Sequence, residues 1–479
     1  MIEILDHRKL NGGKQGSLAV NIVLVIASAL LSALAFPKFN LHYLAWFSLA
    51  PLFLAIYFAF SKRQAAIFGL LWGLVFFLTN LFWVSYLANF VGFWGYFGYF
   101  CLALYEAVFI LVFCLFAKVI IEKPFALLSV PLLWTCFEWL RGVGPFGVSA
   151  GVIGYTQSHQ LLVIQIASFS TVYGVSLVLA FVGMAITEFI VSWHTKKLLF
   201  ASGKMVLTGA VVLLVFLYGQ AQLQQRPLSP LAGKTIAIVQ PNIEQRAKLD
   251  TNKVYSTFRT HEKLTRGVLP VRPDIVIWPE SCVFSYLVQN QLLLKRMRDL
   301  VRDSGSYFIV GTPYHESRDR IYNSMVFFSP SAEVTARYDK QQLVPFGEYL
   351  PFRPLLYPLL QGTGFFASEF SQGERARELP SIEGVNIGPA ICFESTLPFL
   401  MKERARQGAD ILLTITNDAW FFDSSAPFEH IDNGIFRAVE NRKYFIQCAN
   451  TGISAVIDPY GRVLTSSEMG KEQVVVFEF

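Results

Sequence analysis

The sequence predicts a multi-span α-helical membrane domain followed by a separate α/β domain. The chain has 479 residues, of which 53% are hydrophobic and 15% are charged. It is therefore too long for one ordinary domain and too apolar for an ordinary soluble protein. The apolar excess lies in residues 17–220, whereas the chain from about residue 232 has ordinary globular composition. We expect a membrane domain at 1–220, a linker at 221–233 and a second domain at 234–479.

Seven apolar runs are candidates for membrane-spanning helices, because about 20 residues cross roughly 30 Å of hydrocarbon. They are residues 17–36, 43–60, 65–88, 96–121, 125–141, 163–193 and 204–220. The run at 125–141 is short and carries Glu138 and Arg141, which we expect to pair because residues three apart share a helix face. The first run lacks a small-residue cleavage pattern, so we expect a retained anchor and not a signal peptide.

Lysine and arginine residues between these runs predict the orientation of the membrane domain. Loops that share a side with the N-terminus carry ten of them, and the opposite loops carry only Lys38 and Arg141. Positively charged loops face the cytoplasm, so we expect the N-terminus there. With seven crossings, residues 234–479 then lie on the far side, which in a bacterium is the periplasmic side of the inner membrane.

Charge and cysteine spacing argue against several classes of site. The net charge of +6 is explained by loop lysines and arginines near a membrane, and no basic cluster indicates nucleic acid binding. The six cysteines form no CxxC or CxxxC pair and no cluster with histidine at metal-ligand spacing. We therefore expect no nucleic acid partner, no metal and no cofactor.

In the second domain, short apolar runs alternate with helical segments. Strands are expected at 235–240, 273–280, 307–311, 322–328, 334–338, 386–392, 410–416 and 445–457, and helices at 291–303, 397–407 and 428–442. This alternation predicts an α/β domain whose sheets are covered by helices.

Three of these strands end in residues that can carry chemistry, namely Glu280, Lys340 and Cys392. A carboxylate shielded from water can have its pKa raised enough to accept a thiol proton, and a fixed ammonium group stabilises an oxyanion. Each residue alone is more often structural, since a free cysteine usually fills a core and lysine and glutamate are usually solvated. Together they indicate nucleophilic catalysis at an acyl group, while a Cys–His pair with His430 or His315 remains an alternative.

Cys392 closes a short apolar run, and Glu394 follows two residues later. On an extended chain these two side chains point to the same face, whereas Phe393 points to the opposite face. The sequence therefore predicts a thiol that is held at the end of a buried strand and is reached from one side.

The segments around these residues resemble the Glu–Lys–Cys signature of the nitrilase (carbon–nitrogen hydrolase) superfamily. They are Trp278-Pro279-Glu280-Ser281, Tyr338-Asp339-Lys340 and Cys392-Phe393-Glu394, in this order. The segments LVPFGEYLP at 343–351 and TNDAWF at 416–421 resemble, more specifically, the apolipoprotein N-acyltransferase family. The resemblance covers nearly the whole chain, and it implies a nitrilase-like catalytic domain at 234–479 with an αββα sandwich fold.

This resemblance implies an acyltransferase with a ping-pong reaction. Cys392 would take a fatty acyl chain from a membrane phospholipid as a thioester. It would pass the chain to the N-terminal amine of a diacylglyceryl-cysteine lipoprotein, in the last step of lipoprotein maturation. Glu280 would be the general base and Lys340 the oxyanion-stabilising or orienting cation. The partners would be the phospholipid, the diacylated apolipoprotein and the bilayer, and we expect a monomer.

Supporting roles in the catalytic centre also follow from the resemblance. Glu348 and Glu394 match family carboxylates placed around the three catalytic residues. The backbone N–H of Phe393 would be the second oxyanion donor.

Lipid contacts are expected in two aromatic segments. Residues 350–370 are apolar yet rich in proline and glycine, so we expect a loop on or in the lipid, with Phe365 and Phe366 as contacts. Trp420 and Phe421 are expected to be a second contact with acyl chains. Internal packing is the alternative for both segments.

Two other functions remain open. A membrane-anchored amidase or nitrilase would let water resolve the thioester, although such an enzyme has no need of seven spans. A transporter or receptor with a degenerate binding domain would be expected to lack at least one of Glu280, Lys340 and Cys392, and all three are present.

The sequence departs from the family pattern at several positions. Phe393 stands where the family usually has tyrosine, Leu249 where it has tryptophan and Phe422 where glycine is common. The family generally carries an eighth span after the catalytic domain, whereas this sequence reaches Phe479 after Val474-Val475-Val476-Phe477, with no apolar run of about 20 residues.

Overall fold

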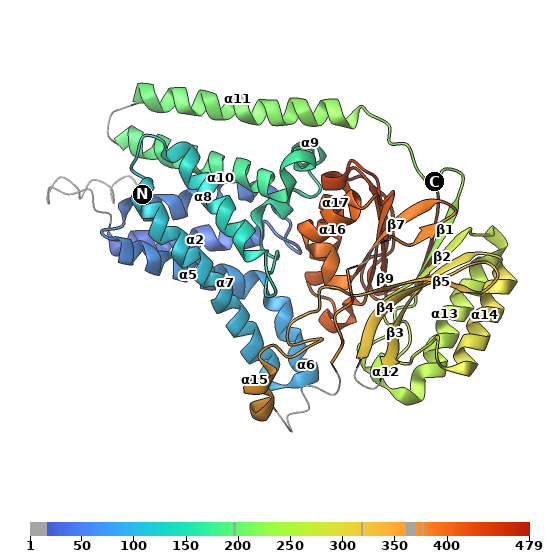
Figure 1. Ribbon diagram of the computed structural model, residues 1–479. Helices are drawn as coiled ribbons and strands as arrows, with labels where there is room; N and C mark the ends of the chain where they lie inside the picture. The colour runs from blue at the N-terminus through green and yellow to red at the C-terminus, as the bar shows by residue number, and fades with distance from the viewer. Residues whose placement is uncertain (1–16, 195–197, 318–319, 361–368, 376–377) are drawn as a thin grey trace. The chain divides into compact units, whose positions relative to one another are not determined.

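The computed structural model describes residues 17–194, 198–317, 320–360, 369–375 and 378–479 (Figure 1). Contacts within the chain divide it into two compact units, Met1–Gln224 and Gln225–Phe479. The described strands all belong to the second unit, and the described part of the first unit is helical.

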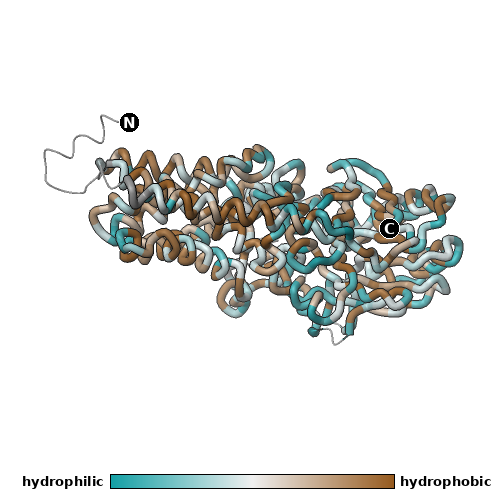
Figure 2. Tube along the Cα trace, turned by 90° about the horizontal axis from the view of Figure 1, so that it is seen from above, coloured by the Kyte–Doolittle hydropathy of each residue, from teal (hydrophilic) through white to brown (hydrophobic). Residues whose placement is uncertain are grey.

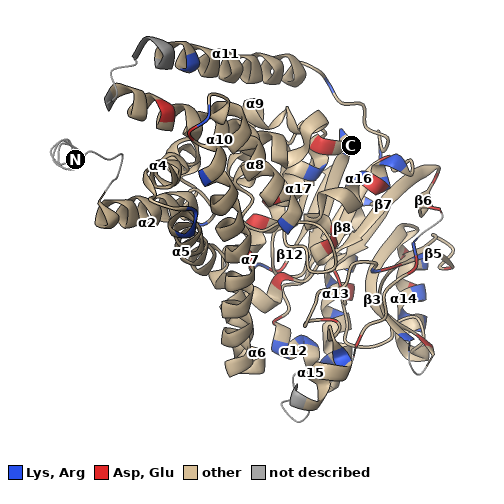
Figure 3. Ribbon diagram, turned by 60° about the vertical axis from the view of Figure 1, so that its left-hand side comes forward, with Lys and Arg blue, Asp and Glu red and all other residues tan. Residues whose placement is uncertain are grey.

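Apolar helices build the first unit. In chain order they are α2 (Leu18–Leu34), η2 (His42–Leu44), α3 (Ala45–Ser48), α4 (Ala50–Phe58), α5 (Lys62–Asn80), η3 (Phe82–Leu87), α6 (Ala88–Val91), α7 (Phe93–Ile120), α8 (Ala126–Arg141), η4 (Ile153–Gln157), α9 (Leu161–Ile164), α10 (Ala167–His194) and α11 (Leu198–Leu223). Figure 2 shows apolar residues along these helices, and Figure 3 shows how few charged residues they carry.

Four helical segments among the described residues are long and apolar enough to cross a membrane. They are Lys62–Asn80, Phe93–Ile120, Ala167–Trp193 and Ser202–Leu223, and shorter apolar segments are Leu18–Leu34, His42–Phe58 and Phe82–Val91. Each of the seven expected runs contains a described helix, but the number of membrane crossings stays a prediction.

Three of the expected runs are not continuous helices. The run at 43–60 is divided at Leu49, between α3 and α4. The run at 65–88 is divided, because α5 ends at Asn80 and the 3-10 helix η3 follows. The helix α10 is interrupted at Thr171, whose φ of 59° and ψ of −175° are not helical. Hydropathy alone does not mark such breaks, since the apolar composition continues through them.

Small residues allow α5 and α7 to pack closely. A Cβ atom at Gly73 would lie 2.6 Å from the Cα atom of Ala107, and one at Gly69 would lie 2.5 Å from the carbonyl oxygen of Ile110. Such close backbone approach is typical of helix pairs in lipid, where small residues at the interface maximise van der Waals contact.

The buried charges of the first unit pair between helices. Arg141 on α8 donates from Nη1 to Glu106 Oε2 on α7 at 2.5 Å. Glu138 Oε1 instead accepts the backbone N–H of Ile153 at 2.8 Å. The expected pairing of Glu138 with Arg141 is therefore wrong. The Arg141 guanidinium pairs with Glu106 on the neighbouring helix α7 and not with Glu138 one turn earlier on its own helix.

The described residues of the second unit form two six-stranded sheets, with strand orders β12-β1-β2-β3-β4-β5 and β11-β10-β9-β8-β7-β6. The strands are β1 (Thr235–Gln240), β2 (Ile275–Trp278), β3 (Tyr307–Ser317), β4 (Arg320–Phe328), β5 (Val334–Asp339), β6 (Ser381–Ile382), β7 (Val385–Ile391), β8 (Ile411–Thr416), β9 (Tyr444–Ala449), β10 (Ala455–Ile457), β11 (Val463–Ser466) and β12 (Gln473–Glu478). The central pairs β1–β2, β2–β3, β7–β8 and β8–β9 are parallel.

Helices and short 3-10 turns connect these strands. They are α12 (Gln245–Leu249), η5 (Thr251–Lys253), α13 (Val254–Val268), η6 (Leu269–Val271), α14 (Gln291–Ser304), α15 (Arg353–Leu360), η7 (Cys392–Thr396), α16 (Pro398–Arg406), η8 (Asp418–Phe421) and α17 (Ala426–Asn441).

The two sheets face each other across an apolar core. Ile238 of β1 and Ile391 of β7 belong to one buried cluster between the sheets. Val239, the next residue of β1, points to the other face and joins a second cluster with Met297 of α14. The helices α13 and α14 cover one sheet, and α16 and α17 cover the other (Figure 1). The layers are therefore αββα, which confirms the fold class expected from the resemblance.

Local features of the second unit differ from the expected pattern. The single strand expected at 445–457 is two strands, β9 and β10, and the strands β11 and β12 and the helix α13 were not predicted. Within the segment 350–370 expected to be a loop, residues 353–360 form the helix α15. Phe365 and Phe366 lie outside the described residues.

Candidate active site

Cys392 lies at a sharp turn at the carboxyl end of β7. The strand ends at Ile391 and the 3-10 helix η7 begins with Cys392 itself. The φ of Cys392 is +52°, a left-handed conformation that residues other than glycine rarely adopt. The expected extended alternation is therefore wrong, because the chain turns at Cys392 and carries Glu394 into the helix. The turn leaves the thiol half-buried at the end of the strand.

Glu394 ties this turn to the loop that follows Lys340. Its carboxylate accepts the backbone N–H groups of Ile391 at 2.8 Å, Gln341 at 2.7 Å and Gln342 at 2.9 Å. Burial raises the pKa of Glu394, although these N–H groups favour the charged form. The side chain thus connects two of the predicted catalytic segments from within the protein.

Lys340 follows β5 and is buried between two carboxylates. Its Nζ donates to Glu348 Oε1 at 2.9 Å and lies 3.7 Å from Glu280 Oε1. Burial acts to lower the pKa of Lys340, but the charges of Glu348 and then Glu280 outweigh it, and the pKa is raised. The ammonium group is therefore a fixed positive charge at any physiological pH.

Glu280 lies just beyond the end of β2 and is 7% exposed. Asn323 of β4 donates from Nδ2 to Glu280 Oε1 at 2.7 Å and to Glu348 Oε1 at 3.0 Å, which links the two carboxylates. Glu348 Oε2 accepts the backbone N–H of Val344 at 2.9 Å. Glu280 and Glu348 thus share the single positive charge of Lys340. One lysine cannot balance two carboxylates, so the cluster retains a group that can act as a base.

The thiol of Cys392 lies within electrostatic reach of this cluster. Burial, and then the negative charge of Glu280, raises the pKa of Cys392, while Lys340 and a hydrogen bond with the Thr416 side chain act in the opposite direction. The thiol is therefore protonated at neutral pH and needs a base to become a nucleophile. The three predicted residues come together at the ends of β2, β5 and β7.

Aromatic residues expected to contact lipid lie near the end of β8. Trp420 and Phe421 belong to η8, and both side chains are half-buried. Phe393, in the second position of η7, is also half-buried. Their contacts with lipid stay predictions.

Both histidines considered as partners of the thiol have other contacts. His430 Nε2 lies 2.7 Å from Ser395 Oγ, and the His315 ring packs against Tyr286 with centroids 5.4 Å apart. Among the described residues neither ring makes a hydrogen bond with Cys392. The arrangement favours a carboxylate base over a Cys–His pair.

Two supporting residues were missed from the sequence. Asn323 is a buried polar residue inside an apolar strand, which is a detectable signal because buried amides need partners. Lys248 of α12 is 4% exposed and donates from Nζ to the backbone oxygen of Glu280 at 2.8 Å. The helix α12 is only five residues long, so its sequence has no apolar periodicity that would show which of its side chains are buried.

Comparison with known proteins decides the family. The sequence profile of the carbon–nitrogen hydrolase family matches residues 235–479, and that of the apolipoprotein N-acyltransferase N-terminal domain matches residues 28–185. An apolipoprotein N-acyltransferase of Geobacter metallireducens is 33% identical over 468 residues, covering 95% of this chain and 88% of the relative. The chain belongs to the apolipoprotein N-acyltransferase family. The family assignment agrees with the resemblance seen in the sequence.

Other members of the apolipoprotein N-acyltransferase family match over similar lengths. The protein of Photobacterium profundum is 28% identical, covering 92% of this chain and 86% of its own, and that of Rickettsia prowazekii is 30% identical, covering 84% and 80%. Among solved structures, an amidase from Nesterenkonia sp. aligns with a TM-score of 0.41 at 19% identity, covering 52% of this chain and 91% of its own.

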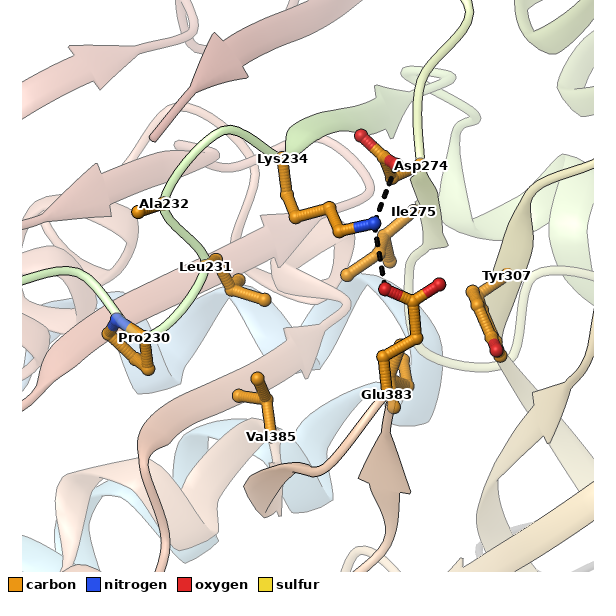
Figure 4. A pocket seen from close by; sticks show the side chains of 10 residues that line it. Pro230, Leu231, Ala232, Lys234, Asp274, Ile275, Tyr307, Glu383 and Val385 are labelled. Atoms are coloured by element: carbon orange, nitrogen blue, oxygen red, sulfur yellow. Dashed lines mark hydrogen bonds and ion pairs between the residues drawn. The ribbon is translucent and has the colours of Figure 1, made fainter.

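A small cavity of about 100 Å³ lies at the amino ends of the strands, whereas the catalytic cluster lies at their carboxyl ends. Figure 4 shows the Lys234 side chain between Asp274 and Glu383. Lys234 precedes β1, and its Nζ lies 3.1 Å from Asp274 Oδ1 and 2.7 Å from Glu383 Oε2. Pairing with Glu383 and then Asp274 raises the pKa of Lys234, so the charge there is already neutralised. The cavity is a structural feature and not part of the catalytic cluster.

Proposed function

We propose that this chain is a membrane-bound N-acyltransferase. It transfers a fatty acyl chain from a phospholipid, through a thioester on Cys392, to the N-terminal amine of a diacylglyceryl-cysteine lipoprotein. Membership of the apolipoprotein N-acyltransferase family supports a lipoprotein as the acyl acceptor. The apolar helices of the first unit support a location in the membrane. The observation that carries the mechanism is the buried cluster of Glu280, Lys340 and Glu348 beside a cysteine whose pKa is raised.

In the first step the Cys392 sulfur attacks the ester carbonyl carbon of the phospholipid. Glu280 takes the thiol proton, and Lys340 together with the Phe393 N–H stabilises the oxyanion. When the tetrahedral intermediate collapses, the C–O bond breaks and the glycerol oxygen receives the proton from Glu280. The products are a lysophospholipid and the acyl thioester.

In the second step the lipoprotein amine attacks the thioester carbonyl. Glu280 accepts a proton from the amine, the C–S bond breaks, and the proton passes to the leaving sulfur of Cys392. The product is an amide, and the enzyme returns to its starting state. Glu348 and Glu394 serve this chemistry by holding Lys340 and the turn at Cys392 in place.

The membrane supplies both lipid substrates to such a site. Phe352 and Leu355, at the start of α15, are 67% and 70% exposed, which suits a segment that meets lipid. We propose that residues 350–370, together with Trp420 and Phe421, contact the acyl chains. We also propose a monomer in the bacterial inner membrane with the catalytic unit on the periplasmic side.

A single-turnover experiment tests the mechanism. Purified protein is incubated in detergent with a phospholipid that carries labelled acyl chains, and the peptide containing Cys392 is analysed by mass spectrometry. We expect one acyl group on that peptide, removable by hydroxylamine and absent in Cys392→Ala, which should lose all transfer to a diacylglyceryl-cysteine peptide. A Cys392→Ala protein that still transfers the acyl chain would overturn the mechanism.

The same experiment separates the acyltransferase from a membrane-anchored amidase. If the thioester forms but is released as free fatty acid at the same rate with and without the acceptor peptide, water is the natural acceptor. Formation of the acylated peptide in proportion to loss of the thioester supports the transferase.

A further inference from the structure

A chain of buried hydrogen bonds ends at the turn that holds Cys392. Asp418 Oδ1 lies 3.1 Å from His430 Nδ1, and His430 Nε2 lies 2.7 Å from Ser395 Oγ. Ser395 Oγ in turn donates to the backbone oxygen of Cys392 at 2.8 Å. The residues Ser395, His430 and Asp418 are 0%, 7% and 3% exposed, so few water molecules can replace these hydrogen bonds.

The direction of these hydrogen bonds follows from the number of protons. A serine hydroxyl carries one proton, and in this chain it goes to the Cys392 oxygen. The Ser395 oxygen then accepts a hydrogen bond from His430 Nε2–H, and all three contacts form together only when His430 Nδ1 also carries a proton and donates to Asp418 Oδ1. Because Ser395 is fully buried and engaged at both ends, it is not available as a second nucleophile.

The Cys392 oxygen belongs to the same peptide group as the Phe393 N–H. A trans peptide group is planar, and its C=O and N–H bonds point in opposite directions. Fixing the C=O bond from one side therefore aims the N–H bond to the other side. Phe393 is the second residue of a 3-10 helix, a position that has no acceptor within the helix for its N–H.

We propose that Asp418, His430 and Ser395 are positioning residues that aim the Phe393 N–H at the oxygen of the acyl group. The proposal deepens the function proposed above and rests on it. A left-handed φ at Cys392 takes the following peptide group out of the β7 ladder. As the first residue of the 3-10 helix η7, Cys392 offers its carbonyl oxygen to the Ser395 backbone N–H, and the Ser395 hydroxyl adds a second hydrogen bond that fixes the orientation of the group. The serine thus acts on the reaction through the peptide group and does not touch the substrate.

A comparison of two reactions of Cys392 isolates this role. Acylation by p-nitrophenyl butyrate passes through an oxyanion, whereas alkylation by iodoacetamide displaces iodide directly and forms no oxyanion. Both rates are measured by mass spectrometry on the peptide containing Cys392, in purified full-length protein. Because removal of an oxyanion donor typically lowers a rate about 10²–10³-fold, misorientation of one should give part of that loss.

Ser395→Ala is the test variant and Thr396→Val is its matched control. Thr396 Oγ1 donates to the backbone oxygen of Phe393 at 2.8 Å, which is the same type of contact made one peptide group further along. We expect Ser395→Ala to lower acylation about 10- to 100-fold while alkylation changes less than about twofold. In Thr396→Val both rates should stay within about twofold of the wild type.

Equal losses of acylation and alkylation in Ser395→Ala, or no loss of acylation, would overturn the proposal. Equal effects of Ser395→Ala and Thr396→Val would do so as well. His430→Gln provides a second variant, because its amide N–H₂ can replace the Nε2 donor to Ser395. It should retain more acylation than His430→Ala, at similar alkylation rates, and the reverse order would contradict the role of the donor.

The outcome is independent of the natural acyl donor. If the wild type is acylated by p-nitrophenyl butyrate but never by a phospholipid, the proposed function fails while the role of Ser395 can still be read from the ratio of the two rates. If phospholipid acylation occurs and the ratio is unchanged in Ser395→Ala, the proposed function stands and the further inference fails.

Discussion

Buried charges at the scale of single residues determine how the site can react. Lys340 is held between Glu348 and Glu280, and the pKa of Cys392 is raised by burial and by Glu280. The free enzyme therefore holds a charged Lys340 that can stabilise an oxyanion, while Cys392 is present as the thiol and not as the thiolate. A site of this kind protects the cysteine from alkylation and oxidation until a substrate arrives.

The reactivity of Cys392 with iodoacetamide should depend steeply on pH. Because the thiol pKa lies above its ordinary value, the thiolate fraction, and with it the rate, should rise about tenfold per pH unit between pH 7 and 9. Glu280→Gln removes a negative charge that raises this pKa, so alkylation at pH 8 should become faster while acyl transfer is lost. A rate plateau below pH 8 in the wild type would contradict this assignment.

Lys248 should make the stability of the protein depend on pH. Burial lowers its pKa to about 8 in the folded state, against an ordinary value of 10.5, so the unfolded chain binds more protons between these values. The free energy of unfolding should therefore rise with pH from 8 to 10.5, and the full penalty, about 3 kcal/mol at most, applies below pH 8.

Lys248→Met tests this pH dependence. The variant should have a higher Tm than the wild type at pH 7, and the difference should shrink at pH 10. Its acyl transfer should fall, since the backbone of Glu280 loses a hydrogen bond. The exposed Lys253 supplies the control Lys253→Met, which should show no such trend. A Tm difference that is the same at both pH values would count against the buried ammonium.

At the scale of elements, short connections between strands and helices align the catalytic groups. Glu394 in η7 accepts the N–H groups of Gln341 and Gln342, so it holds the residues after Lys340 against the turn at Cys392. Asn323 in β4 joins the carboxylates that follow β2 and β5. Three strand ends are thus tied together by side chains that do not react.

Close packing of α5 against α7 should make Gly73 sensitive to a single methyl group. The Cβ atom of Gly73→Ala would lie 2.6 Å from the Cα atom of Ala107, a backbone atom that cannot move alone. We expect a loss of stability of about 1–3 kcal/mol, measured by thermal unfolding in detergent. Gly98→Ala on α7 meets nothing within 4 Å and should leave the Tm unchanged. Equal Tm values for the two variants would show that the helices are not packed this closely.

At the scale of the whole molecule, the proposed orientation can be tested by labelling. With Cys101 and Cys136 replaced by alanine, Lys295→Cys on α14 should react with a membrane-impermeant maleimide in spheroplasts. Arg63→Cys, at the start of α5, should react only after the membrane is lysed. The opposite labelling pattern would place the catalytic unit in the cytoplasm and would mean that the number of crossings is even.

The sequence predicted the division into an apolar first half and an α/β second half, and the residues that end β2, β5 and β7. These are local properties, since composition, period and motif are read within a few neighbouring residues. The sequence also indicated that Glu280, Lys340 and Cys392 act together, because each follows a predicted strand and the three residue types fit nucleophilic catalysis at an acyl group. The pairing of Arg141 with Glu106, 35 residues away, could not be read in this way.

What the sequence determined by itself is therefore the family, the order of the two domains and the reactive residue types. Only the tertiary structure decided the direction of Glu394, because a positive φ at Cys392 ends the strand alternation. It also decided that His430 contacts Ser395 and Asp418, which lie 35 and 12 residues away in the chain. The physical reason is that hydrogen bonds between buried polar groups depend on distances set by the packing of whole elements, which no local pattern contains.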